Sequence, residues 1–235
     1  MQVVILCGGK GTRMDSLTKE TPKPLLKVGD KAVLWHLIKR FSGFGYKEFI
    51  LCLGYLGDQI QEYFSYPENR EKEWKIHFVD TGLESSKSER IQKVEHLITG
   101  KSFLLSYGDD LSAVHLPALT EFHLHNNKIV TLTSIPLHSD FGVLELNEHN
   151  QVKKFREKPR LLEYWVNGGF YVCDKEVFKH LHLGEFEEKV LPKLAEKEEV
   201  VAFKFEGFWK SMNTNKDVIE FNQIFEKGNS PWKNW

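Results

Sequence analysis

Residues 3–13 read Val-Val-Ile-Leu-Cys-Gly-Gly-Lys-Gly-Thr-Arg, an apolar run followed directly by a glycine-rich turn. The run from Val3 to Leu6 is short enough to be a buried first strand. Three glycines in four positions let the backbone turn tightly and direct several N–H groups at one anion. The stretch therefore indicates a phosphate-binding loop at the end of a strand, although a glycine-rich turn by itself is also common on protein surfaces.

Two cationic side chains follow this loop closely in the sequence. Arg13 carries a planar guanidinium that can grip phosphate oxygens, and Lys23, between two prolines, adds a compact positive charge. The two most familiar phosphate loops do not fit. A dinucleotide-binding loop that starts at Gly9 needs Gly or Ala where Met14 stands, and a Walker loop needs Ser or Thr where Gly11 stands.

The bulk composition is that of an ordinary globular protein. The 235 residues are 41% hydrophobic and 28% charged, which suits one domain with an adequate core, so we expect a single domain over residues 1–235. The 32 basic and 33 acidic side chains nearly cancel, which gives no general field for nucleic acid or a membrane surface. No apolar run approaches the roughly 20 residues of a spanning helix.

The cysteines and the N-terminus predict a cytoplasmic protein. Cys7, Cys52 and Cys173 stand in apolar stretches at wide spacing, which is typical of buried thiols rather than of a disulfide framework or a zinc site. The sequence enters its first strand without a basic region or a cleavage site, so we expect no secretion.

The first half alternates short apolar strands with amphipathic helices. The expected strands are 49–53, 76–79, 103–107 and 129–135, and the expected helices are 32–44, 57–64, 89–98 and 116–126. This alternation predicts a parallel sheet covered by helices on both faces. In such sheets ligands bind at the carboxyl ends of strands, where the loop after Leu6 and the turn after Tyr107 would meet.

After about residue 136 the strands come closer together. The ranges 141–146, 152–155 and 166–173 predict a mixed or antiparallel extension, followed by helices 186–196 and 217–226 that flank strands 200–205 and 208–212. The tail, residues 231–235, contains two tryptophans, so we expect it to pack against the body or a subunit interface.

Asp109 and Asp110 follow a predicted strand, where a carboxylate is well placed to hold a hard cation. Magnesium takes one or two carboxylates, while water and substrate phosphates fill its other positions. A solvated Asp-Asp turn is the alternative. The position at a strand's carboxyl end favours the metal.

A second cluster of polar residues lies in the extension. Lys158 could bind a second phosphate, whereas Glu157 and Asn167 could hydrogen-bond hydroxyl groups, and Gly168 would let the backbone approach a ring. Each of these could also be a turn at a strand end. Their order after a phosphate loop and a candidate metal ligand favours a binding role.

These motifs together resemble the signature of the sugar-1-phosphate nucleotidylyltransferases, the NDP-sugar pyrophosphorylases. The resemblance runs the length of the chain and is closest to the glucose-1-phosphate cytidylyltransferase branch. It is carried by the glycine loop, the Thr-Pro-Lys-Pro segment, Tyr107-Gly108-Asp109, Glu157-Lys158-Pro159 and Asn167-Gly168-Gly169-Phe170. It implies a Rossmann-like (GT-A-like) α/β fold, with a mixed, mainly parallel sheet flanked by helices. The nucleotide-binding part would span about 1–135 and a small sugar-binding extension about 136–235.

The resemblance also implies a role for each matching residue. Arg13 and Lys23 would be catalytic, and Lys23 would bridge the α-phosphate and the sugar phosphate. The nucleotide would be bound by Leu6, Gly8, Gly9, Gly11, Thr12, Arg13, Thr81, Gly82, Tyr107 and Gly108. The sugar phosphate would be bound by Glu157, Lys158, Asn167, Gly168 and Glu187, and Mg²⁺ by Asp109 and Asn213.

The implied reaction converts a nucleoside triphosphate, CTP in this branch, and a sugar 1-phosphate, glucose 1-phosphate, into an NDP-sugar and pyrophosphate. The implied partners are these two substrates and further copies of the chain. Two departures from the branch leave alternatives open. Asn213 stands where the branch has an Asp, so a non-catalytic, nucleotide-sensing homologue is one alternative. Residues 87–90 read Lys-Ser-Glu-Arg instead of Thr-Gly-Gly-Arg, which leaves a cytidylyltransferase for a different phosphorylated acceptor.

Overall fold

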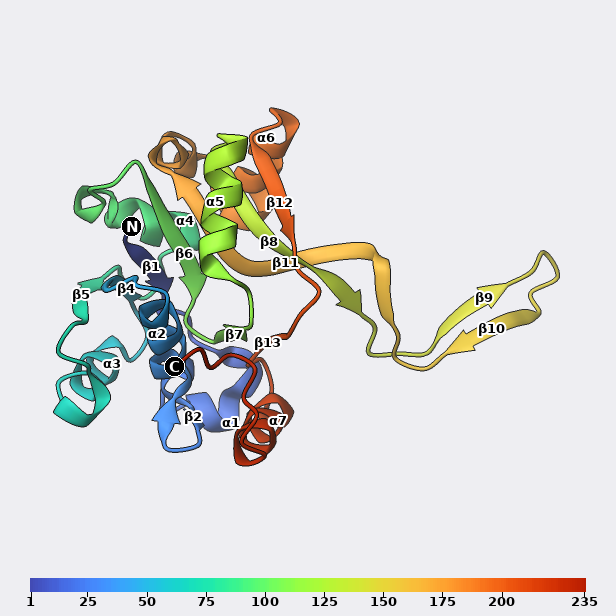
Figure 1. Ribbon diagram of the computed structural model, residues 1–235, viewed down its shortest axis with the longest axis horizontal. Helices are drawn as coiled ribbons and strands as arrows, with labels where there is room; N and C mark the ends of the chain where they lie inside the picture. The colour runs from blue at the N-terminus through green and yellow to red at the C-terminus, as the bar shows by residue number, and fades with distance from the viewer.

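The fold is built around one seven-stranded sheet with helices on both sides (Figure 1). The structure is a computed structural model that describes residues 1–235 apart from the side chains of Arg13, Asp15 and Ser16. The sheet has the order β12-β8-β11-β6-β1-β4-β5. Its strands are β1 (Val3–Leu6), β4 (Glu48–Leu53), β5 (Lys75–Asp80), β6 (Ser102–Tyr107), β8 (Val130–His138), β11 (Arg160–Asp174) and β12 (Val200–Lys204).

The sheet is mixed but mainly parallel, which confirms the expected α/β class. β6, β1, β4 and β5 run parallel to one another, and β12 runs parallel to β8. Only β11 is antiparallel, to β6 on one side and to β8 on the other. The carboxyl ends of β1, β4, β5 and β6 therefore share one edge of the sheet.

The alternation of side chains along β1 explains the two helical layers. Val3 and Ile5 enter one apolar cluster, together with the buried face of α2 (Val33–Gly43), while Val4 enters a second cluster with α4 (Lys87–Lys93). The other helices are α1 (Asp15–Thr18), α3 (Gly57–Tyr63), α5 (Leu116–Asn126), α6 (Leu191–Glu196) and α7 (Asn215–Glu226). Short 3-10 or π turns are η1 (Thr12–Met14), η2 (Lys23–Leu25), η3 (Pro67–Asn69), η4 (Glu95–Leu97), η5 (Lys175–Leu183) and η6 (Phe186–Val190).

The regular first half matches the expected elements to within a few residues, whereas the second half differs. β11 has 15 residues instead of the eight predicted, and its pairing with β8 shifts register twice. The pattern over residues 160–165 was too irregular to predict a strand. The strand expected over residues 208–212 is found as β13 (Trp209–Ser211), but its antiparallel partner β7 (Asp110–Ser112) was not predicted. The ladder of β2 (Lys27–Val28) with β3 (Lys31–Ala32) was also missed, because strands of two or three residues give too short a pattern.

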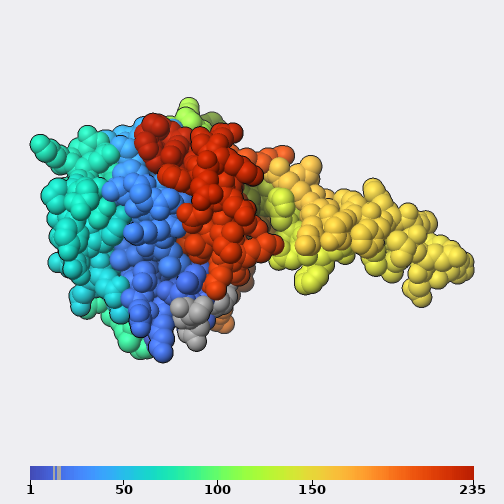
Figure 2. Space-filling model, turned by 90° about the horizontal axis from the view of Figure 1, so that it is seen from below, coloured from blue at the N-terminus to red at the C-terminus, as the bar shows by residue number. Residues whose placement is uncertain are grey.

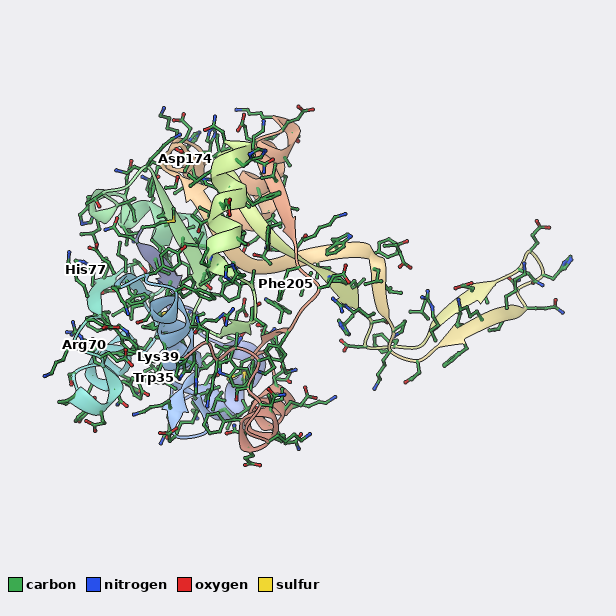
Figure 3. All side chains as sticks on the ribbon, viewed as in Figure 1. Trp35, Lys39, Arg70, His77, Asp174 and Phe205 are labelled. Atoms are coloured by element: carbon green, nitrogen blue, oxygen red, sulfur yellow. The ribbon has the colours of Figure 1, made fainter. Side chains whose placement is uncertain are left out.

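The segment between β8 and β11 forms a hairpin of β9 (Val143–Leu146) and β10 (Val152–Arg156) that projects far from the body (Figure 1). The side chains of the hairpin extend into open space, while Phe205 lies near the part of the body from which the hairpin leaves (Figure 3). Of the predicted extension, the strands 141–146 and 152–155 form this projecting arm, whereas the strand 166–173 lies in β11 of the central sheet.

The C-terminal segment packs against the N-terminal third of the chain (Figure 2). Trp232 is fully buried against Phe221, and its carbonyl accepts a 2.7 Å hydrogen bond from Nη1 of Arg40 on α2. The expectation that the aromatic tail packs on the body is confirmed for Trp232. Among the residues that the structure describes, no helix has the length and apolar character needed to cross a bilayer.

Candidate active site

A cavity of about 560 Å³ opens at the carboxyl ends of β1 and β6. The two strand ends are held together because the amide of Gly108 donates a 3.1 Å hydrogen bond to the carbonyl of Leu6. Ten of the residues singled out from the sequence line this cavity: Leu6, Gly8, Gly9, Gly11, Lys23, Tyr107, Gly108, Asp109, Asn167 and Asn213. Residues from distant parts of the chain thus meet where ligands bind in open α/β sheets.

The glycine loop follows the back wall of the cavity, and two of its glycines have a specific steric reason. A Cβ on Gly8 would lie 2.2 Å from Nη1 of Arg90, so only glycine fits beneath that guanidinium. Gly11 has a φ of +64°, a conformation that other residues rarely adopt. The loop is therefore fixed in shape, and it presents its backbone to the cavity at Gly8, Gly9 and Gly11.

Lys23 is the cation at the centre of the cavity. Its ammonium pairs with the carboxylate of Asp109 and donates a 3.0 Å hydrogen bond to Oδ1 of Asn213. Pro22 and Pro24 on either side set the backbone of the short turn that carries Lys23. Asn213 is brought close because β13 pairs with β7, and the amide of Met212 donates to the carbonyl of Asp109 at 3.0 Å.

Asp110 lies behind Asp109 and is buried. A Cβ on Gly169 would lie 2.6 Å from Oδ2 of Asp110, so the second glycine of the Asn-Gly-Gly motif makes room for this carboxyl. Burial, together with the neighbouring charge of Asp109, raises the pKa of Asp110 well above its usual range. The two adjacent acids therefore have different environments: Asp109 pairs with the ammonium of Lys23, whereas Asp110 is buried at the cavity wall.

Next to the lining residues Tyr107 and Asn167 lie hydrogen-bonding groups of Gly168, Tyr171 and Glu187, none of which lines the cavity itself. The hydroxyl of Tyr107, the last residue of β6, contacts the carboxylate of Glu187 and lies 2.9 Å from the hydroxyl of Tyr171. Asn167 donates to the Tyr171 hydroxyl at 2.5 Å. The carbonyl of Gly168 accepts a 2.6 Å hydrogen bond from the indole of Trp209. Asn167 and Glu187, both expected near the sugar, are joined through the two tyrosines.

Thr81 and Gly82, which the resemblance assigns to nucleotide binding, lie behind Arg90 rather than on the cavity wall. The guanidinium of Arg90 donates to Oγ1 of Thr81 at 2.7 Å and to the carbonyls of Leu53, Gly8 and Leu83 at 3.0 to 3.1 Å. Arg90 therefore ties the glycine loop to the ends of β4 and β5, and it lines the cavity itself.

Three expected ligands lie away from the cavity. Thr12 is exposed beside the glycine loop, and Glu157 and Lys158 are exposed in the turn between β10 and β11, at the base of the arm. None of the three lines the cavity. The side chain of Arg13, expected to be catalytic, is outside the described residues.

Several lining residues were given no binding role from the sequence, although Lys87 stands at a departure from the branch motif. Ser85, Ser86 and Lys87 form the wall at the start of α4, and Trp209 and Ser211 line the cavity from β13. The capping pattern of Ser86 with Glu89 marks the start of that helix in the sequence. Trp209 lies in the predicted strand 208–212, but the sequence does not show that this strand pairs with β7 and so brings Trp209 to the cavity.

Comparison with known proteins agrees with this geometry. Residues 2–228 match the family model described as Nucleotidyl transferase. Over its whole length the chain is 36% identical to the "Probable glucose-1-phosphate cytidylyltransferase" of Bacillus subtilis (strain 168) and 35% identical to the "Glucose-1-phosphate cytidylyltransferase" of Salmonella typhi, and each match covers 100% of both proteins. The solved structure of HddC from Yersinia pseudotuberculosis has the same fold, with a TM-score of 0.74 and 22% identity over 95% of this chain and 99% of that one.

The chain therefore belongs to the nucleotidyl transferase family and is a nucleotidyltransferase. Its full-length similarity within that family is to the glucose-1-phosphate cytidylyltransferases.

Members of this family generally use a divalent metal, and the oxygen atoms of the cavity fit one. The carboxylate of Asp109 and the amide oxygen of Asn213 converge on the ammonium of Lys23. In the described part of the chain, no group of three or more His, Cys, Asp or Glu side chains could hold an ion by itself. One carboxylate and one amide oxygen suit a Mg²⁺ that takes its other ligands from water and phosphates.

Proposed function

We propose that this enzyme transfers CMP from CTP to glucose 1-phosphate, giving CDP-glucose and pyrophosphate. The observation that carries the proposal is the meeting of the glycine loop, Lys23 and Asp109 around one cavity. The chain in which they meet has full-length similarity to glucose-1-phosphate cytidylyltransferases.

The chemistry follows from the charges. An oxygen of the sugar phosphate, already negative, attacks the α-phosphorus of CTP, and the bond to the β-phosphate oxygen breaks in line, so pyrophosphate leaves with that electron pair. No general base is required because the attacking oxygen carries no proton. Lys23 holds the two reacting phosphates together and offsets their charge, which is the main contribution a protein makes to such a transfer. We assign Arg13 to the triphosphate.

We further propose Mg²⁺ as the metal, held by Asp109 with Asn213 as a weaker ligand. When bound, it supplies charge neutralisation at the phosphates. Asp109 would hold the metal, and Lys23, which pairs with Asp109 in this structure, would hold the reacting phosphates. Lys23 reaches the oxygens of Asp109 and Asn213 from a turn fixed by two prolines.

The choice of CTP rests on the names of the relatives and on a general argument. A site built to accept the exocyclic amine of cytosine leaves acceptors unpaired against uracil and rejects UTP. We assign this recognition to the glycine loop and to Arg90, which line the cavity, with Thr81 and Gly82 supporting Arg90 from behind.

The proposal is tested by measuring pyrophosphate release across a matrix of nucleoside triphosphates and phosphorylated acceptors. Turnover with CTP and glucose 1-phosphate is the expected result. Turnover only with another acceptor would instead identify a cytidylyltransferase of different acceptor specificity. Binding of CTP without any turnover would identify a nucleotide-sensing homologue.

We also propose that the enzyme is a homo-oligomer and that the hairpin of β9 and β10 makes the contact. Leu144 lies opposite Phe155 and Leu146 opposite Val152, so the four apolar side chains share one face, and each is 48 to 62% exposed. On the other face Lys154 pairs with Glu145. An isolated two-stranded hairpin is marginally stable in water, and the same face on a second copy can cover it symmetrically.

For the compartment we propose the cytoplasm, where nucleoside triphosphates and a reducing environment are found. Cys7, Cys52 and Cys173, all buried as free thiols, support this choice.

A further inference from the structure

Lys87 and Glu187 form an ion pair beside the cavity. Lys87 is the first residue of α4, whose start is fixed by the side chain of Ser86, and Glu187 lies in the π turn η6. Their Nζ and Oε1 atoms are 2.5 Å apart, although the residues are 100 positions apart in the sequence. The pair therefore connects two elements that meet only through the fold.

The pair has a defined position because it is held by Tyr107. The Tyr107 hydroxyl contacts the same carboxylate oxygen of Glu187, and the ammonium of Lys87 lies 4.8 Å from the centre of the Tyr107 ring. A cation over an aromatic face is attracted by the ring. Tyr107 comes two residues before Asp109, so the ion pair is anchored to the same strand end as the candidate metal ligand.

The two sides of the cavity have different chemistry. The glycine loop, Lys23 and Asp109 suit phosphates and a cation. Asn167, Tyr107 and the Lys87–Glu187 pair suit hydroxyl groups, because they offer donors and acceptors with little net charge. With the phosphates on the first side, the sugar ring of the acceptor lies against the second.

The charges of the pair then decide which sugars fit. Lys87 lines the cavity and its side chain is 46% exposed, so a ligand can reach it directly. The Glu187 side chain is 27% exposed and does not line the cavity, but it contacts the lining residues Lys87 and Tyr107, so its charge lies directly behind them. A neutral hydroxyl can donate to Glu187 or accept from Lys87. A carboxylate on the sugar meets the negative charge of Glu187, while the positive charge of Lys87 is already engaged, and like charges in close contact exclude a wrong partner.

We propose that Lys87 and Glu187 are specificity-determining residues that admit a neutral sugar 1-phosphate and reject one with a carboxylate on the sugar. This inference rests on the proposed function. It names the acceptor class, and it gives a role to Lys87, one of the residues at which the chain departs from the cytidylyltransferase motif.

The test compares glucose 1-phosphate with glucuronic acid 1-phosphate, which differs by one carboxylate, at saturating CTP and Mg²⁺. For the wild-type enzyme we expect kcat/KM for glucose 1-phosphate to be at least about a hundredfold higher. Glu187→Gln keeps the shape and the contact with Tyr107 but leaves Lys87 unpaired. This variant should shift the ratio towards the carboxylated sugar by roughly tenfold or more. The double variant Glu187→Gln with Lys87→Met should show no such shift, because the unpaired ammonium is removed as well.

Lys87→Met alone gives a second readout at a half-exposed position that tolerates change. It should raise KM for glucose 1-phosphate by roughly fivefold, while KM for CTP and kcat stay unchanged. The matched control is Lys179→Met, which removes a lysine from an exposed ion pair with Glu176 on η5 and should change neither constant.

The results separate this inference from the proposed function. A wild-type enzyme that uses glucose 1-phosphate, but whose acceptor ratio is the same in Glu187→Gln, contradicts the role of the pair and leaves the proposed function intact. Equal kcat/KM values of the wild-type enzyme for the two sugar phosphates also contradict the role of the pair and leave the proposed function intact. Absence of pyrophosphate release from CTP with every acceptor contradicts the proposed function itself.

Discussion

The ammonium of Lys23 donates a 3.0 Å hydrogen bond to Oδ1 of Asn213, a residue 190 positions later in the chain. The contact exists because β13 pairs with β7 and carries the following residues to the end of β6. One cation thus touches two oxygens that the fold brings from separate strand ends. This arrangement makes Lys23 and Asn213 the residues whose substitution is most informative.

Replacing Lys23 by alanine should lower kcat by roughly a hundredfold or more, because a preorganised charge at the reacting phosphates is lost. The measurement is pyrophosphate release at saturating substrates, with thermal unfolding to verify the fold. Lys27→Ala, at an exposed lysine on β2, is the control and should keep full activity. A folded Lys23→Ala enzyme with near-normal kcat would reduce this lysine to a structural partner of Asp109.

Replacing Asn213 by aspartate should lower the Mg²⁺ concentration needed for half-maximal activity by roughly fivefold or more. A second carboxylate next to the first adds direct attraction for a divalent cation. Titration of activity with Mg²⁺ at fixed CTP measures the effect. An unchanged Mg²⁺ dependence would mean that Asp109 and the phosphates hold the metal without help from position 213.

The sequence predicted the parts of the site that depend on local pattern. The strand before Gly8 and the turn after Tyr107 follow from apolar runs that end in turn residues, and the parallel sheet brings those ends together. The position of Arg90 could not be predicted in this way. Its four contacts reach three strand ends and the loop after β5, so they depend on tertiary packing.

The direction of the arm formed by β9 and β10 could not be predicted from the sequence either. Glu157 and Lys158 belong to a motif that the resemblance assigned to the sugar phosphate, and the pattern of residues 152–155 predicted a strand. Neither feature tells in which direction a hairpin leaves the sheet, because that depends on the bends and register shifts of β11. The structure brings Asn167 to the cavity and leaves Glu157 and Lys158 at the base of the arm.

Replacing Phe155 by glutamate should reduce the size of the assembly in solution. Phe155 is 62% exposed on the apolar face of the arm, and a charge there cannot be buried against a second copy without a large desolvation cost. Size-exclusion chromatography with light scattering measures the mass, and Lys154→Gln on the opposite face is the control. A wild-type protein of 27.4 kDa, the mass of one chain, would contradict the homo-oligomer.

Acidification should destabilise the protein partly through His36. This residue is 1% exposed, with Nε2 2.8 Å from the carbonyl of Val28, and burial lowers its pKa from 6.5 to about 4. The unfolded chain therefore binds a proton at His36 at a higher pH than the folded one. The contribution of neutral His36 to the free energy of unfolding is complete above about pH 6.5 and is lost as the pH falls towards 4. The loss is at most about 3 kcal/mol.

The experiment compares urea unfolding of the wild type and of His36→Gln between pH 4 and 7. Glutamine can retain the hydrogen bond to Val28 but does not titrate, so the loss of free energy of unfolding on acidification should be smaller in the variant. Protonation of carboxylates also lowers the free energy of unfolding in acid, but it affects both proteins equally and cancels in the comparison. Parallel pH curves for the two proteins would show that His36 titrates normally.

The most direct test of the account is the product formed from each nucleotide. The purified enzyme is incubated with glucose 1-phosphate, Mg²⁺ and either CTP or UTP, and both the NDP-sugar and pyrophosphate are quantified. We predict CDP-glucose and pyrophosphate in equal amounts, with a specificity constant for CTP at least about a hundredfold above that for UTP. Comparable constants for the two nucleotides would contradict the assignment to CTP, and absence of both products would contradict nucleotidyl transfer to glucose 1-phosphate.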